Sequence, residues 1–154
     1  MQAAVFGIVG VLLGGILTFA GNYLLHKSES AEAARIEHAA AAARARDERK
    51  AAYIRLLTTA RRLRYVARNP DRGDSDAIDD LRTQLSTTQY EIELISSYEI
   101  AVVANSVRRA TLDYLNASLD GRPTDDTRRK ARGAVSEMVT AAQRDLALPV
   151  TSSA

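Results

Sequence analysis

The residue types that carry most protein chemistry are scarce in this chain. Among its 154 residues there is no cysteine and no tryptophan, and the two histidines are His26 and His38. Without cysteine the chain can form no disulfide, thiolate zinc site, iron–sulfur centre or thiol nucleophile. The histidines lie far apart in a polar stretch, without the i, i+4 partner that helical metal motifs use. We therefore expect no metal and no cofactor.

Patterns typical of enzymes are missing as well. The sequence contains no HExxH motif, phosphate-binding loop, dinucleotide fingerprint or nucleophile elbow. Helical di-iron sites need Glu-x-x-His pairs, which this chain lacks. The aspartates between Asp71 and Asp80 lack the glycine and glutamate spacing of a calcium loop, and the dipole of a helix that begins there explains them. We predict no catalytic residues and no enzymatic activity.

The basic run Arg61-Arg62-Leu63-Arg64 could contact phosphate groups. No DNA- or RNA-binding motif accompanies it, and the net charge of the chain is only +2. In a straight helix Arg61 would lie about 54 Å beyond Leu25, whereas a charged membrane surface acts over about 8–10 Å. We interpret the run as a solvated helix face and do not expect a nucleic-acid partner.

Residues 3–25 contain no charged side chain, and all the formal charges of the chain follow Leu25. A helix of this length spans about 35 Å, enough to cross the apolar core of a bilayer. The alternative is a cleaved signal peptide, which needs a positive segment before the apolar one. That segment is absent, and Thr18-Phe19-Ala20 offers only a weak cleavage site, so we predict a retained transmembrane helix over 3–25.

The basic residues beside this span set its expected orientation. No Lys or Arg precedes it, whereas Lys27, Arg35, Arg44 and Arg46 follow it. Positive residues flank transmembrane helices on the cytoplasmic side. The sequence therefore predicts a single-pass protein of the cell membrane with its N-terminus outside and its C-terminal domain in the cytoplasm.

Small residues form one face of the predicted span. They recur at steps of three or four, and Gly10 and Gly14 also form a GxxxG motif. Such a face lets two helix backbones approach closely in lipid. We predict that it mediates association, either in a homo-oligomer or with a membrane protein partner. Its residues are Gly7, Gly10, Gly14, Thr18 and Gly21.

The remainder of the chain divides into a stalk, a bundle and a tail. Residues 26–52 are rich in Ala, Glu and Arg, which favour a helical stalk. Residues 53–148 contain four amphipathic helices separated by breaks at 69–73, near Ser97 and at 120–123. Ser96 and Glu99 match a capping box at the start of the third helix, and Thr124 is the expected cap of the fourth. Residues 149–154 form a flexible tail.

Each predicted bundle helix carries an apolar stripe with steps of three and four residues, which in the second helix resembles a coiled-coil seam. Short connections favour antiparallel neighbours, so we predict an all-α, up-down-up-down bundle. The four stripes are Tyr53, Leu56, Leu57, Ala60, Leu63 and Ala67; Ile78, Leu81, Leu85, Thr88, Ile92 and Ile95; Ile100, Val103, Val107, Ala110, Tyr114 and Ala117; and Ala131, Val135, Met138, Ala142 and Leu146.

Charge is divided unevenly along this part of the chain. Residues 27–70 contain 11 basic and 5 acidic side chains, whereas residues 71–120 contain 4 basic and 10 acidic ones. The two segments therefore carry net charges of +6 and −6. Exposed ion pairs contribute at most about 1 kcal/mol each. We expect attraction between the segments, within the bundle or between chains, to influence register more than stability.

The layout resembles a loose group of small, uncharacterised membrane proteins from actinobacteria. The resemblance rests on the N-terminal span, on Arg49-Lys50-Ala51-Ala52-Tyr53 and on residues 92–100, IELISSYEI. It implies a membrane-anchored helical protein and supplies no catalytic residues. We predict a function in association, tethering or scaffolding. The alternative is a signalling or sensor subunit whose bundle repacks when a ligand or partner binds. The polar residue Thr88 in the apolar seam of the second helix would allow two packing arrangements. The sequence does not indicate which small molecule, if any, is the ligand.

Overall fold

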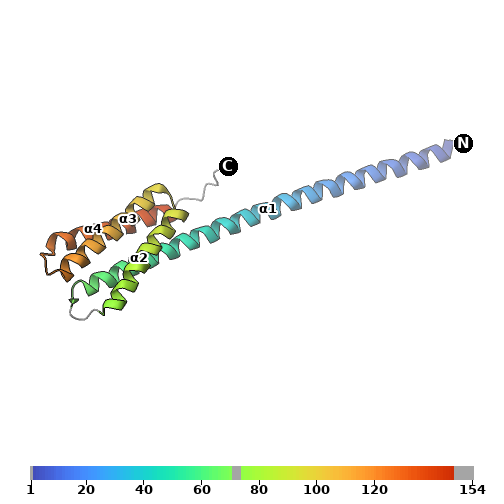
Figure 1. Cartoon of the computed structure of the whole chain (residues 1–154). Coiled ribbons are helices and arrows are strands. Elements are labelled where there is room, and N and C mark those ends of the chain that lie inside the picture. Colours follow the sequence, from blue (N-terminus) through green and yellow to red (C-terminus); the bar gives the residue numbers. More distant parts are fainter. Residues whose placement is uncertain (1, 71–73, 148–154) are drawn as a thin grey trace. The chain divides into compact units, whose positions relative to one another are not determined.

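A computed structural model describes the backbone of residues 2–70 and 74–147, and the side chains of residue 32 and of residues 35–70 and 74–147. All regular elements within these ranges are helices, so the predicted all-α class is confirmed. In chain order they are α1 (Gln2–Val66), α2 (Ser75–Ile95), α3 (Tyr98–Leu119) and α4 (Asp125–Ala147) (Figure 1).

The chain divides into two compact units, Met1–Ala43 and Arg44–Ala154. In the first unit, side chains 35–43 are exposed apart from Ala42, which is half-buried. No helix is long and apolar enough to cross a membrane among the residues whose side chains are described. The predicted span over 3–25 and its small-residue face lie outside those residues.

The helix boundaries follow from local chain chemistry. Residues 22–69 contain neither glycine nor proline, so nothing interrupts α1 before Asn69-Pro70, where the missing amide of proline ends a helix. The side chain of Asp74 accepts a hydrogen bond from the amide of Asp76 at 3.2 Å and caps α2. Gly121 adopts a φ of +65° in the predicted turn after α3, a conformation that glycine tolerates best.

The predicted capping box at Ser96 is wrong by one residue. Ser97 is the N-cap of α3, and its hydroxyl accepts from the amide of Ile100 at 3.5 Å. Ser96 instead ends α2, where its own amide donates to the carbonyl of Ile92. Only two residues, Ser96 and Ser97, connect α2 to α3. Because Ser96 is already the C-cap of α2, the N-cap of α3 is the second serine.

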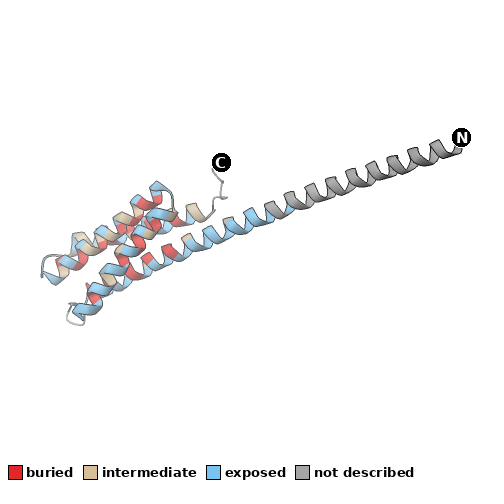
Figure 2. Ribbon diagram, turned by 45° about the vertical axis from the view of Figure 1, so that its right-hand side comes forward, coloured by how far each residue is buried: buried red, intermediate tan, exposed pale blue. Residues whose placement is uncertain are grey.

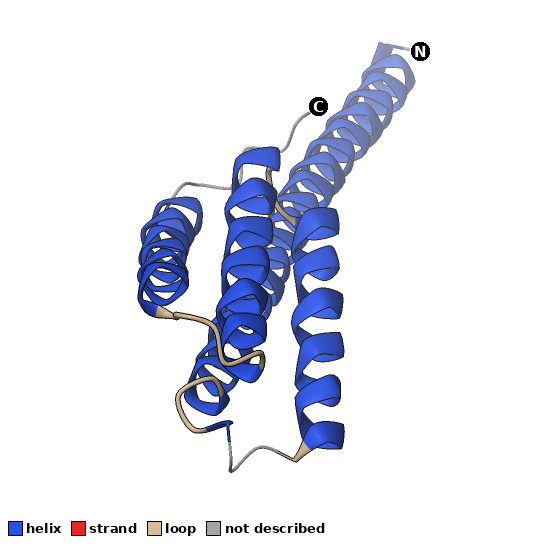
Figure 3. Ribbon diagram, turned by 60° about the vertical axis from the view of Figure 1, so that its left-hand side comes forward, coloured by secondary structure: helices blue, strands red, loops and turns tan. Residues whose placement is uncertain are grey.

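The described part of the second unit is an antiparallel bundle of four helical segments (Figure 3). Arg55 and Thr59 of α1 contact Glu91 and Gln84 of α2 in descending order, as antiparallel neighbours must. Arg82 near the start of α2 contacts Asn116 near the end of α3. The ends of the bundle therefore differ: one contains the α2–α3 turn, and the other contains the α1–α2 and α3–α4 connections.

The core lies between the facing sides of these helices (Figure 2). Every residue of the four predicted stripes is buried or half-buried. The stripes miss several buried positions, among them Leu115, Ala104 and Ala134. These lie one position beside a predicted stripe residue or one helical turn from it, because a helix inside a bundle contacts two neighbours and buries a wider face than one seam requires.

Candidate functional site

The described structure contains one buried polar network, at the end of the bundle where α2 turns into α3. Its centre is the hydroxyl of Tyr53 on α1, a residue that is 2% exposed. This hydroxyl lies 2.9 Å from Oδ2 of Asp145 on α4 and 2.8 Å from Oγ of Ser96. Because the phenol has a single proton and the carboxylate only accepts, Tyr53 donates to Asp145 and Ser96 donates to Tyr53.

Arg49 completes the network from one helical turn before Tyr53. Its Nη1 lies 3.2 Å from Oδ2 of Asp145, and both side chains are mostly buried, with 16% and 12% exposure. One turn earlier, Arg46 donates to the backbone carbonyl of Leu146 near the end of α4. Three consecutive contacts from α1 thus hold the last turn of α4, and they begin before residue 53, where the first apolar stripe starts.

Burial raises the pKa of Tyr53 from 10.0 to about 12. The hydrogen bond from Ser96 acts against this rise, whereas the hydrogen bond to Asp145 and its charge add to it. The tyrosine is therefore a neutral donor at ordinary pH. This network holds a carboxylate and positions it; it offers no activated nucleophile.

A cavity of about 450 Å³ opens beside the network, between α3 and α4. Ile100, Val103 and Ala141 give it an apolar wall, and Glu137, Arg144 and Asp145 contribute charge. Asp145 therefore joins the buried network to the cavity. No described set of three or more His, Asp or Glu residues is arranged to hold a metal ion. The contacts that the site does show are hydrogen bonds and an ion pair.

The residues singled out in the sequence lie in ordinary surroundings. His38 is exposed, whereas His26 and the small-residue face from Gly7 to Gly21 lie outside the described side chains. Asp74, Asp76, Asp79 and Asp80 are exposed around the start of α2, where Asp74 acts as the cap. The cap and the first-turn position of Asp76 agree with the helix-dipole interpretation, whereas Asp79 forms an ion pair with Arg82.

Thr88, which interrupts the apolar seam of α2, is buried, and its hydroxyl donates to the carbonyl of Gln84 at 2.8 Å. It therefore satisfies its polar group within its own helix and requires no partner on another helix. Sequence reasoning missed the Tyr53 network altogether. The apolar stripe identifies Tyr53 as a core residue but does not show which groups its hydroxyl contacts. Ser96 was predicted to be a helix cap.

Comparison with known proteins adds no assignment to this geometry. No family model matches the chain, no curated protein matches its sequence, and no solved structure matches its fold.

Replacement of Tyr53 by phenylalanine should remove a pH-dependent part of the stability. The folded chain holds the Tyr53 proton more tightly than the unfolded chain does, so the contribution is fully present below pH 10 and is lost as the pH rises from 10 to about 12. We expect a loss on the order of 2 kcal/mol over this interval in the wild type. Denaturant unfolding across the interval should show a shallower decline for Tyr53→Phe; parallel declines would contradict the assignment.

Asp145→Asn should destabilise the bundle, because it leaves Arg49 mostly buried without a counter-charge. We expect the free energy of unfolding to fall by about 1–3 kcal/mol. Asp126→Asn is a matched control on the same helix: its ion pair with Lys130 is exposed, with 66% and 70% of the two side chains accessible. Unfolding of both variants in urea should separate them, and equal stabilities would show that the buried pair is not structural.

Proposed function

We propose that this chain is a single-pass, membrane-anchored protein whose cytoplasmic bundle binds a partner protein and tethers it to the membrane. The anchor rests on the uncharged run over residues 3–25 and on the basic residues that follow it. The tethering role rests on one feature of the bundle surface, an apolar patch at the end where α2 meets α3.

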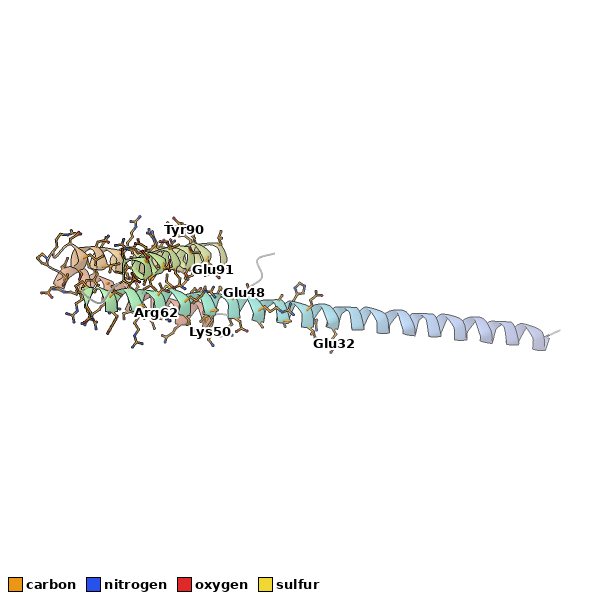
Figure 4. The ribbon with its side chains drawn as sticks, turned by 60° about the horizontal axis from the view of Figure 1, so that its bottom comes forward. Glu32, Glu48, Lys50, Arg62, Tyr90 and Glu91 are labelled. Atoms are coloured by element: carbon orange, nitrogen blue, oxygen red, sulfur yellow. The ribbon has the colours of Figure 1, made fainter. Side chains whose placement is uncertain are left out.

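This patch consists of Tyr90, Leu94, Tyr98 and Val102, which we call the partner patch. Leu94 and Tyr98 are 86% and 84% exposed, and the other two are more than half exposed. Tyr90 and Leu94 are one turn apart on α2, as are Tyr98 and Val102 on α3, so each pair lies on one helix face. Figure 4 shows Tyr90 on the side of the bundle that faces away from α1.

Exposed apolar side chains that gather in one place mark interaction surfaces, whereas scattered ones are common. Aromatic residues are especially frequent at such surfaces because a large apolar ring loses little conformational entropy on binding. Two tyrosines and a leucine at a single corner of the bundle fit this description. The partner patch therefore supports recognition of another protein better than it supports a passive surface.

The charge around the patch indicates what kind of partner it fits. Residues 83–107 contain three acidic side chains, Glu91, Glu93 and Glu99, and no basic one. Glu91 is paired with Arg55 of α1. No ion pair among the described residues includes Glu93 or Glu99, although Arg144 lines the same cavity as Glu99. The fitting partner is a protein segment that carries apolar side chains flanked by Lys or Arg.

Photo-crosslinking in native membranes should identify the partner. A photoreactive amino acid placed at Leu94 or Tyr98 should form an adduct with one protein, identified by mass spectrometry. The same probe at exposed Arg62 on α1 is the control and should not form that adduct. Adducts only with a second copy of the chain would indicate a homo-oligomer and would contradict the proposal that the patch binds a different protein. Absence of any adduct at the patch would contradict the tethering role.

Association within the membrane is tested separately, on the small-residue face. Replacing Gly10 and Gly14 by isoleucine places branched side chains where two backbones are expected to meet, so crosslinked dimers or complexes should decrease severalfold. Leu12→Ile with Ile16→Leu changes the opposite face of the predicted helix and should have no effect. Unchanged crosslinking in the glycine variant would show that this face is not a contact.

A further inference from the structure

Five arginines lie close to one another on α1 and α4, at the end of the bundle opposite the Tyr53 network. Arg61, Arg64 and Arg68, from α1 and the turn after it, line a groove between α1 and α4. Arg128 and Arg132, from the first turns of α4, line a separate hollow, and their charges act on Arg64. We call these five residues the arginine cluster. The arginines of α1 and those of α4 are sixty or more positions apart in the sequence and meet only because the two helices are antiparallel neighbours.

Arg64 is at the centre of the cluster. Burial lowers its pKa, and the charges of Arg68, Arg132 and Arg128 lower it further, whereas Tyr114 on α3 acts in the opposite direction. Guanidinium groups on two different helices are thus close enough to repel one another. A protein keeps such an arrangement at a cost in stability unless an anion neutralises it.

The described residues do not provide that anion. Every ion pair among them uses other basic residues, and none includes a member of the arginine cluster. Asp125 lines the same hollow as Arg128 and Arg132 but forms no ion pair with them. In addition, Nε of Arg64 and Nε of Arg128 are buried without a hydrogen-bond acceptor. Nε of Arg108 and the hydroxyl of Thr111 are in the same condition elsewhere in the bundle. The two donors of the arginine cluster are free to bind an acceptor, as buried donors usually do.

The groove beside the cluster has room for more than an inorganic ion. It measures about 410 Å³ and lies between α1 and α4. Leu57, Val135 and Val139 give it an apolar floor, and Tyr65, which is 59% exposed, lies at its edge. A ligand there would meet guanidinium groups on one side and apolar or aromatic surface on the other.

We propose that the arginine cluster binds an organic polyphosphate, with the phosphate groups on the guanidinium side and the organic part against Tyr65 and the apolar floor. The planar guanidinium fork matches two oxygens of a phosphate group, and its charge does not depend on ordinary pH. Five arginines require a ligand with several negative charges, which a chain of phosphates supplies. The site lies at the opposite end of the bundle from the partner patch and does not rely on the proposed tethering.

Calorimetric titration of the full chain in phosphatidylcholine nanodiscs tests the proposal, with inorganic triphosphate and ATP as probes. Both should bind, and ATP should bind more tightly because its base can stack on Tyr65; Tyr65→Ala should remove this difference. Arg64→Gln and Arg68→Gln, which change arginines that line the groove, should each weaken binding about tenfold or more, as expected for the loss of charge-assisted hydrogen bonds. Arg62→Gln is the matched control: it removes the same charge from an exposed position on α1 that does not line the groove, and should leave binding unchanged.

Thermal unfolding of the same variants separates binding from folding. Without ligand, Arg64→Gln should unfold at the wild-type temperature or above it, because the substitution removes repulsion. Short-chain phosphatidylglycerol added in solution distinguishes two sources of the phosphate group: loss of triphosphate binding in its presence would assign the site to a lipid headgroup, and retained binding would assign it to a soluble ligand. Absence of binding, or equal weakening by Arg62→Gln and Arg64→Gln, would overturn the proposal.

Discussion

The contact between α1 and α4 closes the bundle, and the character of both its ends depends on this contact. The other three pairs of neighbouring helices are joined by short connections, so little chain entropy is lost when they meet. α1 and α4 have no such connection, and Asp145 lies 92 positions after Tyr53. Their contact has to be stabilised by its own interactions. The Tyr53 hydroxyl, the Asp145 carboxylate and the Arg49 guanidinium provide these at one end, where the carboxylate accepts from the phenol and pairs with the guanidinium.

The other end of the same contact is electrostatically unfavourable. The charges of Arg68, Arg128 and Arg132 all lower the pKa of Arg64, and Leu57, Val135 and Val139 line the groove between the two helices. An acidic residue at any of these positions would have attracted the arginines of the other helix. The sequence has aspartates close by, at Asp125 and Asp126, but Asp126 pairs with Lys130 on the outer side of α4. At one end of the α1–α4 contact the charged groups thus pair with each other, whereas at the other end the arginines require an added anion to neutralise them.

Much of the fold could be predicted from the sequence, because the steps of three and four in the apolar stripes reflect the helix period directly. The breaks at Asn69-Pro70 and Gly121 were equally clear, since proline and glycine act on the backbone itself. The Tyr53 network was beyond such reasoning. It depends on which side chains approach across the bundle, and two helices with correct stripes can be aligned in several registers. Arg61 and Arg64 belong to a basic run that the sequence shows clearly, but the arginines that approach them on α4 belong to a separate run. Considered alone, each run is most simply interpreted as a solvated helix face.

The uneven division of charge along the sequence produces few ion pairs in the bundle. Strong attraction between the basic segment over 27–70 and the acidic segment over 71–120 would appear as ion pairs between α1 and the next two helices. In the described structure a single pair, Arg55 with Glu91, joins the two segments. The other acidic residues divide between the two ends of the bundle: Asp74, Asp76, Asp79 and Asp80 lie around the start of α2, at the same end as the arginine cluster, whereas Glu93 and Glu99 lie beside the partner patch. Charge therefore varies from one surface to the next and not from one end of the bundle to the other. The arginine cluster is suited to anions where α1 meets α4, and the partner patch is suited to basic, apolar protein segments where α2 meets α3.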